Sequence, residues 1–351
     1  MPRFFIPFCL KLCAKGASNE AFLLQEEPSA RDIEVKGLKI HRLSRGSFLS
    51  MVSRLRRTIR AAGATVVHAH SKEVFFIALW AARLQRCRFV YSVHTPADAA
   101  LTGFWLRQAD SIVAATGKLE DFLKTKKRLG APKLTCIPTG VDLEYIDYQA
   151  QAESAEEIRS RLNIHPDRFL IGNIAPLTPE EDQLTLLKAM RKLLAKKLDA
   201  ELVLLGKGPM QEKLAAFIQE NRMQERVRIL PEWENLYTFQ KSCDCLIWTT
   251  FGYERRESIL TASVLGKPVI ATKIGSHEEI IIEGKTGYLV PCGFPERIDT
   301  AVMRLKATPA LAGQIGGQGR AFVEEHFSLE SMATRYGDVY RSLLGIGKVA
   351  V

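Results

Sequence analysis

The residues best suited to contact a ligand lie in two charged turns near the carboxyl end of the chain. Residues 254–257 read Glu-Arg-Arg-Glu, and residues 275–279 read Gly-Ser-His-Glu-Glu. Arginine forms strong charge-assisted hydrogen bonds to anions, and carboxylates accept hydrogen bonds from hydroxyl groups. These residue types indicate a binding role, and the alternative for residues 254–257 is a charged turn that is simply solvated.

Short apolar runs predict the elements that position these turns. Residues 245–249 predict a buried strand, residues 258–265 a helix that ends at Gly266, and residues 269–272 the next strand. Strand, helix and strand in this order form a βαβ unit. Ligands bind at the loops that leave the carboxyl ends of parallel strands, so both charged turns should face one cleft.

The same alternation of strands and helices extends over most of the chain. Strands are predicted at residues 65–70, 88–94, 169–177 and 200–206, with helices between them. This order predicts an α/β protein with doubly wound parallel sheets. A polar segment near residues 150–167 predicts the boundary between two domains.

Composition limits the class of protein. The chain has 351 residues, of which 46% are hydrophobic and 25% charged, as is usual for a globular protein of about two domains. A net charge of +10 suits contact with nucleotide diphosphates, acidic lipid headgroups or nucleic acid. The sequence has no aromatic-basic platform or known nucleic-acid-binding module, so nucleic acid is not expected as a partner. Seven cysteines without a Cys-x-x-Cys pair favour a reducing cytoplasm.

The first 45 residues are the hardest to interpret. Residues 1–16 hold an apolar patch that Pro7 and Lys11 interrupt, too short to span a bilayer and without a small-residue cleavage site after it. We expect a buried strand or a frayed end there, and a membrane-surface anchor is the alternative. Whether Met1 is the natural start stays open.

Residues 48–62 have apolar positions at helical spacing. Four arginines lie along this predicted helix: Arg54, Arg56, Arg57 and Arg60. We expect them to form a solvated face. Contact with anionic lipid headgroups is the alternative.

Three histidines fall on or beside predicted strands. His68 and His70 share one face of their strand, which suits a metal ion, but no third ligand stands at a convincing spacing. We therefore expect no metal site. His94 ends the next strand, at an edge where active sites gather, and the alternative is a satisfied loop histidine.

Several motifs in a fixed order resemble the retaining glycosyltransferases of family 4. They are GKPVIATKIG at residues 266–275, GKTGYLVP at residues 284–291, VHAHS, YSVHTP and IPTGVD. The resemblance spans roughly residues 64–343. It implies the GT-B fold, in which two Rossmann-like domains face a cleft and a C-terminal helix crosses back to the first domain. The implied divisions are residues 1–155 on the acceptor side, 156–330 for the nucleotide sugar, and 331–351 for the crossover helix and tail.

The resemblance also implies residues for the donor site. His94 would lie near the donor sugar and help to orient it. Gly206 and Gly208 follow a strand and would let backbone N–H groups approach the donor phosphates. A dinucleotide fingerprint is the rival interpretation of these glycines, but its third glycine is missing. The loop with Pro231 and Glu232 would lie where the family binds the base.

Two departures weaken the phosphate site that the resemblance implies. The family's first strand, Gly-rich loop and helix are missing or rewritten in residues 1–45. The positions of a phosphate-binding arginine and lysine hold Pro176 and Glu181, and each lost charge-assisted hydrogen bond is worth about 1.5–3 kcal/mol. We hypothesise that Lys207, Arg255 or Arg256 replaces these cations.

A third departure affects two glutamates that the family separates by seven residues. The second falls on Thr261, at the ribose position, and the first falls on Tyr253, although a shorter loop would let Glu254 bind the transferring sugar. Glu257 is the reserve candidate. The remaining donor-site residues that the resemblance implies are Gly275, Ser276 and Glu279.

The implied activity is sugar transfer from a nucleotide-diphosphate sugar, most often UDP-linked, with retention of anomeric configuration. The acceptor would be a lipid-linked or cell-envelope saccharide, and neither a metal ion nor another cofactor would be required. Such a protein would be cytoplasmic, alone or in peripheral contact with the inner face of the membrane. The alternative is a catalytically impaired GT-B pseudoenzyme that binds a saccharide or a partner transferase.

Overall fold

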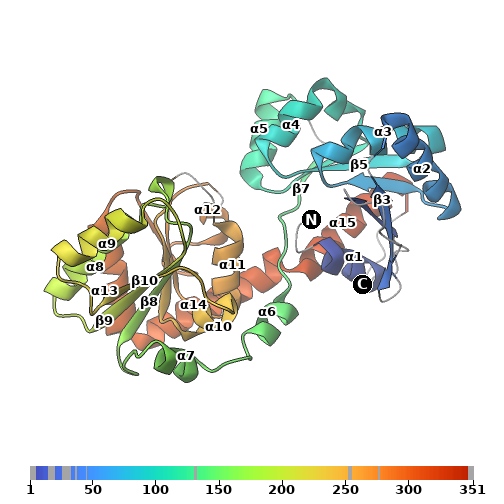
Figure 1. The fold of residues 1–351 in the computed structure, drawn as a ribbon. Coiled ribbons are helices and arrows are strands. Elements are labelled where there is room, and N and C mark those ends of the chain that lie inside the picture. Colours follow the sequence, from blue (N-terminus) through green and yellow to red (C-terminus); the bar gives the residue numbers. More distant parts are fainter. Residues whose placement is uncertain are drawn as a thin grey trace. The chain divides into compact units, whose positions relative to one another are not determined.

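The chain folds into two compact units (Figure 1). The computed structural model describes residues 5–14, 20–25, 33–35, 38–44, 46–129, 133–251, 255–275 and 277–346. Unit 1 comprises residues 1–140 and 326–351, and unit 2 comprises residues 141–325.

The division falls at residue 140 rather than at residue 155 because the segment between these positions is bonded to unit 2. Asn235 donates a hydrogen bond to the carbonyl oxygen of Gln149 (2.8 Å), and the Lys241 ammonium donates one to that of Ala150 (3.1 Å). Asp147 accepts two hydrogen bonds from the Arg320 guanidinium, at 2.9 and 2.7 Å. Helix α6 (Leu143–Gln149) therefore belongs to unit 2.

Unit 2 is built on a six-stranded sheet in which every neighbouring pair is parallel, in the order β10-β9-β8-β11-β12-β13. Its strands are β8 (Phe169–Ile174), β9 (Ala200–Leu205), β10 (Val227–Leu230), β11 (Cys245–Trp248), β12 (Val269–Thr272) and β13 (Tyr288–Val290). The chain builds outward from β8 to β10 and then returns to start again at β11. The switch point between β8 and β11 is where open α/β sheets bind ligands.

Helices cover both faces of this sheet (Figure 1). They are α7 (Ala155–Arg161), α8 (Gln183–Ala195), α9 (Gln211–Glu220), α10 (Leu236–Ser242), α11 (Arg256–Val264), α12 (His277–Ile280), α13 (Pro295–Ala307) and α14 (Pro309–Phe327), with the short 3-10 turn η2 (Pro179–Glu181). The predicted βαβ unit is thus β11, α11 and β12.

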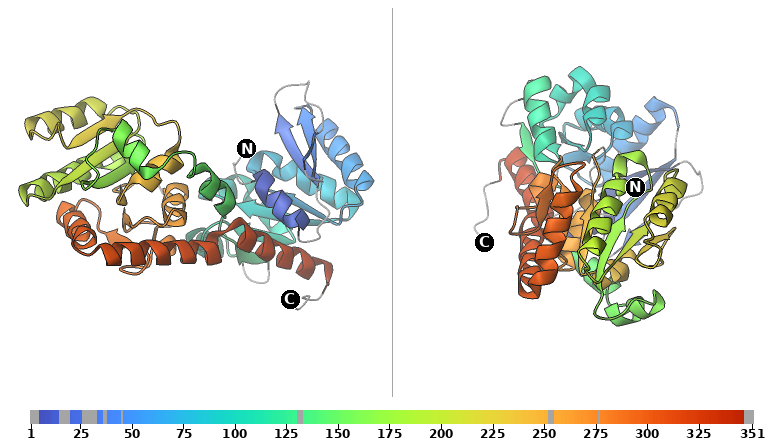
Figure 2. Two further views of the ribbon diagram at one scale, coloured as in Figure 1. Left: turned by 90° about the horizontal axis from the view of Figure 1, so that it is seen from below. Right: turned by 90° about the vertical axis from the view of Figure 1, so that its left-hand side faces the viewer.

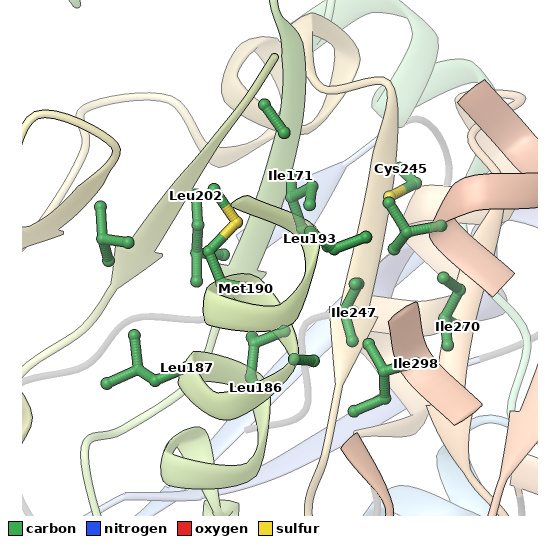
Figure 3. Packing of buried hydrophobic residues seen from close by; sticks show 14 of the residues in the cluster. Ile171, Leu186, Leu187, Met190, Leu193, Leu202, Cys245, Ile247, Ile270 and Ile298 are labelled. Carbon is green, nitrogen blue, oxygen red and sulfur yellow. The ribbon is translucent and has the colours of Figure 1, made fainter. Parts of the chain in front are cut away.

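The core of unit 2 explains why its strands were predictable from apolar runs. Ile171, Leu202 and Ile247, on three neighbouring strands, pack against Met190 and Leu193 of α8 (Figure 3). Each of these side chains is at most 1% exposed. Strands buried on both faces need apolar residues at consecutive positions, and this produces the runs.

Unit 1 contains a four-stranded parallel sheet in the order β4-β5-β6-β7, and a three-stranded sheet in the order β1-β3-β2. The strands are β1 (Glu20–Gln25), β2 (Ile33–Val35), β3 (Leu38–Ser44), β4 (Val66–Ala69), β5 (Arg88–Val93), β6 (Ser111–Ala114) and β7 (Leu134–Cys136). The helices are α1 (Phe5–Ala14), α2 (Phe48–Ala61), α3 (Lys72–Gln85), α4 (Pro96–Thr102), α5 (Gly117–Lys126) and α15 (Leu329–Leu344), with the 3-10 segment η1 (Gly103–Gln108).

The prediction of a strand or a frayed end at the amino terminus is wrong, because residues 5–14 form helix α1. Phe8, Cys9 and Leu12 are buried, a spacing that places them on one helical face. Pro7 lies in the first turn, where its missing N–H leaves no helical hydrogen bond unmade. Helix α1 lies beside α15 (Figure 2), and Phe8 contacts the Tyr336 ring with ring centroids 5.1 Å apart. It is the first element in the described part of the chain, where the Gly-rich βα unit of the family is not seen.

Helix α14 provides a test of backbone packing in unit 2. A Cβ atom added at Gly316 would lie 1.9 Å from the carbonyl oxygen of Gly266, whereas one added at Gly317 would meet nothing within 4 Å. Gly316→Ala should therefore lower the free energy of unfolding by about 2–3 kcal/mol. Gly317→Ala, the matched control, should raise it by about 0.5–1 kcal/mol through helix propensity. Urea denaturation measures both, and equal effects would contradict this packing.

Candidate functional site

The loops after β8, β9 and β11 meet at the carboxyl edge of the unit 2 sheet, and hydrogen bonds join them; η2 is part of the loop after β8. The loop after β11 is tied to η2, since the Thr249 hydroxyl donates to the carbonyl oxygen of Glu181 (2.8 Å) and the backbone N–H of Phe251 to that of Glu180 (2.9 Å). The loop after β9 is tied to the loop after β8, since the N–H of Leu177 donates to the carbonyl oxygen of Lys207 (2.9 Å). The edge is therefore a connected surface rather than a set of independent loops.

Gly206 and Gly208 allow the loops after β8 and β9 to lie in close contact. A Cβ atom at Gly206 would lie 2.0 Å from the carbonyl oxygen of Ala175, and one at Gly208 would lie 2.2 Å from that of Leu177. The N–H of Gly206 donates to the carbonyl oxygen of Leu230 at 2.8 Å. These contacts account for both glycines as packing residues, and contact with phosphates stays a prediction.

The most buried charge pair at this edge joins Glu181 of η2 to Arg255. The Glu181 side chain is 1% exposed, and its Oε1 pairs with Nη2 of Arg255. Burial lowers the pKa of the Arg255 guanidinium, but at neutral pH the group stays charged. Glu181 stands where the resemblance expects a lysine, and the loop after β11 thus brings a cation back to that place.

A second pair joins Arg256 of α11 to Glu279 of α12. The distance between Arg256 Nη1 and Glu279 Oε2 is 3.1 Å, and the side chains are 13% and 24% exposed. The pair connects the loop after β11 to the loop after β12. Two of the cations proposed from the sequence therefore lie at one edge, each bonded to a carboxylate.

His277 fixes the backbone of this loop and was not predicted as a site residue. The side chain is fully buried; Nδ1 bonds to the carbonyl oxygen of Thr272 (2.9 Å), and Nε2 accepts the N–H of Arg255 (3.1 Å). A carbonyl can only accept and an amide can only donate, so the ring must be neutral with its proton on Nδ1. The signal in the sequence is its position in the turn at residues 275–279, directly after a predicted strand.

The other predicted site residues of unit 2 make no bond to the Glu181–Arg255 and Arg256–Glu279 pairs among the contacts described. Lys207 and Glu232 form an exposed ion pair of 2.9 Å, in which the side chains are 62% and 79% exposed. The side chain of Glu257 is exposed in the first turn of α11. The Thr261 hydroxyl is directed to its own helix, where it donates to the carbonyl oxygen of Glu257 at 2.9 Å.

The structure describes two of the four remaining predicted site residues. Pro231 lies in the loop after β10, next to Glu232, and is exposed. Gly275 has a φ of +45° in the turn before α12. Glu254 and Ser276 lie outside the described residues.

The histidines of unit 1 form a hydrogen-bonded cluster with helix α15. His68 on β4 bonds through Nδ1 to the Tyr340 hydroxyl (2.6 Å) and through Nε2 to the Ser92 hydroxyl (2.8 Å). The Ser92 hydroxyl in turn bonds to that of Tyr336 (2.7 Å). These bonds join β4, β5 and α15, so His68 holds the last helix in place. The only indication of the two tyrosines in the sequence is their spacing, four residues apart on the apolar face of α15.

His70 and His94 continue this cluster toward the carboxyl edge of the unit 1 sheet. Ring centroids are 3.9 Å apart for His68 and His70, and 6.2 Å apart for His70 and His94. Burial lowers the pKa of all three imidazoles, and that of His70 falls to about 3. Neighbouring imidazoles add to the lowering for His68 and His70, whereas Asp98 opposes it for His94. The three rings are therefore neutral at neutral pH.

His94 lies directly before helix α4, and hydrogen bonds fix its backbone. The Asp98 carboxylate accepts the N–H groups of His94 (3.2 Å) and Thr95 (2.8 Å), and the Thr95 hydroxyl accepts the N–H of Asp98 (3.2 Å). A neutral imidazole held in this way can exchange hydrogen bonds with a ligand hydroxyl. No group of three or more potential metal ligands exists in the described ranges of either unit.

Helix α2 has the amphipathic form that its sequence predicts. Val52, Leu55 and Ile59 are buried, and all four arginines are exposed. Within the described residues, no helix combines the length and the apolar character that crossing a bilayer requires.

Comparison with known proteins decides the family. The family model described as "Glycosyl transferases group 1" matches residues 154–322, and the one described as "Glycosyltransferase Family 4" matches residues 17–145. The chain belongs to glycosyltransferase family 4. The resemblance found in the sequence is thereby confirmed.

Relatives in the family are distant in sequence. The lipopolysaccharide core biosynthesis mannosyltransferase LpcC of Rhizobium leguminosarum is 25% identical over 255 residues, which are 70% of this chain and 68% of LpcC. The uncharacterized glycosyltransferase MJ1059 of Methanocaldococcus jannaschii is 24% identical over 191 residues, 53% of this chain. That alignment spans 46% of the archaeal protein, about half its length.

Solved structures confirm the GT-B fold. A glycosyltransferase from Rickettsia africae superposes with a TM-score of 0.80 at 16% identity, covering 99% of this chain and 96% of the other. Alr3699/HepE of Anabaena, solved in complex with UDP, superposes with a TM-score of 0.74 at 17% identity, covering 95% of each chain. The prediction of two Rossmann-like parallel-sheet domains with a C-terminal helix returning to the first is confirmed.

Proposed function

We propose that this protein transfers a sugar from a nucleoside-diphosphate sugar to an acceptor hydroxyl with retention. The observation that carries the proposal is the Arg255 guanidinium, held against Glu181 at the switch-point edge of unit 2. The bond between the anomeric carbon and the diphosphate breaks while the acceptor oxygen bonds to that carbon on the same face, and the proton of the acceptor hydroxyl passes to an oxygen of the leaving diphosphate. The leaving diphosphate gains negative charge, which a cation fixed in advance stabilises most.

The remaining residues take supporting roles in this proposal. Arg256 and Glu279 hold the loop after β12, Lys207 contacts the diphosphate as a further cation, and Glu232 contacts the base. His94 exchanges a hydrogen bond with a hydroxyl of the donor sugar, and Glu254 or Glu257 accepts one. The donor carries uridine diphosphate, which is supported by the UDP bound in Alr3699/HepE.

The acceptor in this proposal is a lipid-linked or cell-envelope saccharide. Support comes from LpcC, a mannosyltransferase of lipopolysaccharide core biosynthesis. Such an acceptor is presented at a membrane surface, and the net charge of +10 suits contact with anionic headgroups there.

Calorimetric titration with UDP, GDP, ADP and their sugar conjugates tests the proposal. We expect micromolar affinity for one series. Arg255→Gln should weaken it about tenfold or more through loss of a charge-assisted hydrogen bond, and Glu181→Gln should strengthen it because a carboxylate no longer competes for Arg255. Lys188→Gln, an exposed change on α8, is the control and should leave affinity unchanged.

The opposite result has a definite meaning. If no nucleotide binds at millimolar concentration and Glu181→Gln restores no binding, the transfer reaction is excluded. The non-catalytic alternative, a GT-B protein that binds a saccharide or a partner transferase, would then be favoured.

A further inference from the structure

Four large apolar side chains are exposed together on unit 1. Trp80 and Leu84 lie on α3, and Phe104 and Trp105 lie on η1; each is between 44% and 72% exposed. The Trp105 ring contacts the Phe76 ring of α3 edge to face, with centroids 6.1 Å apart. The two elements therefore form one continuous apolar surface, here named the α3–η1 surface.

Cations surround this surface, and several are bonded to carbonyl oxygens. The Arg83 guanidinium donates to the carbonyl of Gln108 (2.5 Å), that of Arg107 to the carbonyl of Lys127 (3.4 Å), and the Lys133 ammonium to the carbonyl of Ala109 (3.3 Å). A hydrogen bond to a carbonyl oxygen orients a cationic side chain but does not neutralise its charge. Arg86 and Lys126 are also exposed beside these groups.

Acidic residues contribute little at this surface. Asp110 pairs with Arg88 at 3.4 Å and accepts the N–H of Phe89 at 2.8 Å. Glu73 lies in the first turn of α3, whereas Trp80 and Leu84 lie in the second half of that helix. The surface as a whole is therefore apolar at its centre and positive at its margin.

We propose that the α3–η1 surface docks on an anionic lipid bilayer. Tryptophan prefers the boundary between headgroups and acyl chains, where its ring is buried and its N–H stays solvated. Phenylalanine and leucine side chains gain by entering the acyl region, and arginine and lysine are attracted to anionic headgroups. This contact goes beyond the proposed transfer reaction and involves no residue of the unit 2 site.

Two other occupants fit the surface less well. A second copy of the chain in a two-fold dimer would bring the same cations of both copies together, which is repulsive. Single-stranded nucleic acid stacks on aromatic rings, but an exposed aliphatic side chain such as Leu84 offers its bases no stacking surface. A membrane uses the aromatic, aliphatic and cationic groups alike.

Vesicle sedimentation of the full chain tests the proposal. The parent protein should bind vesicles of mixed phosphatidylcholine and phosphatidylglycerol and bind pure phosphatidylcholine much more weakly. Trp80→Ser combined with Phe104→Ser should reduce binding about tenfold or more through loss of buried apolar area. Arg86→Gln and Lys126→Gln should each reduce it about fivefold, more at low salt than at high salt.

Matched controls separate this surface from others. Phe294→Ser and Lys213→Gln remove an exposed aromatic residue and an exposed cation of unit 2 and should leave vesicle binding unchanged. Vesicle binding that survives the α3–η1 changes but is lost on Arg56→Gln with Arg57→Gln would place the contact on α2 and overturn the proposal. Tighter binding of a single-stranded oligonucleotide than of vesicles, lost on the same α3–η1 changes, would also overturn it.

The experiment is independent of the transfer reaction. UDP titration of the α3–η1 variants should match the parent protein, because none of the changed residues belongs to the proposed donor site. A protein that binds anionic vesicles but no nucleotide would retain this inference and lose the proposed function.

Discussion

Replacing Arg255 by alanine should lower the free energy of unfolding by about 3 kcal/mol, because the change leaves the Glu181 carboxylate charged and buried. Glu181 is 1% exposed, whereas its partner is 25% exposed, so the carboxylate bears most of the loss. Removing one partner of a buried ion pair is costly even where the pair itself adds little net stability. Glu181 is thus the residue that makes Arg255 structurally necessary, whatever the ligand.

Urea denaturation of a small set of variants tests this dependence. Glu181→Leu combined with Arg255→Met should recover most of the stability, since neither side chain then carries an unpartnered charge. Lys207→Ala is the control, because its partner Glu232 is exposed and such surface pairs contribute about 0.2–1 kcal/mol. If Arg255→Ala lowers the free energy of unfolding no more than Lys207→Ala does, the Glu181 carboxylate must be stabilised by groups other than Arg255.

This pair also shows where prediction from sequence stops. Counting positions against the family places Glu181 at a lysine site and suggests a lost cation. The sequence cannot show that Arg255, 74 positions later, reaches the same place, because that depends on how the loops after β8 and β11 are tied together. Residues in one loop could be listed from the sequence, but their partners could not.

More of the fold than of the site could be predicted from the sequence. The strands of unit 2 were predictable because burial on both faces requires short continuous apolar runs, and β11 and β12 begin where those runs begin. Helix α1 does not follow from the sequence pattern, because Pro7 interrupts its short apolar run, although a proline in the first turn costs no hydrogen bond. The bond from His68 to Tyr340 spans 272 positions and follows from the return of α15 to unit 1, which no local pattern encodes.

Acidification should destabilise unit 1 before carboxylate protonation becomes important. Burial lowers the pKa of His70 to about 3 and that of His68 well below its usual value, so both bind protons more readily in the unfolded chain. A group whose pKa is lowered by folding stabilises the fold above its unfolded pKa of about 6.5 and loses that contribution as the pH falls. For His70 the loss is about 1.4 kcal/mol per pH unit below about pH 6, and His68 acts in the same direction.

Hydrogen exchange at α15 measures this loss where it arises. The backbone amides of α15 should open more easily between about pH 6.5 and about pH 5, after correction for the intrinsic exchange rate, while those of β8 in unit 2 should not. His70→Gln should reduce the slope, whereas His165→Gln, an exposed histidine of unit 2, should leave it unchanged. Tyr340→Phe should lower the protection of α15 at every pH, because it removes a hydrogen bond to His68. It should not change the pH slope contributed by His70, because it removes no group that titrates in this range. A slope that is the same in the parent protein and in His70→Gln would mean that the buried imidazoles become protonated without opening the contact with α15.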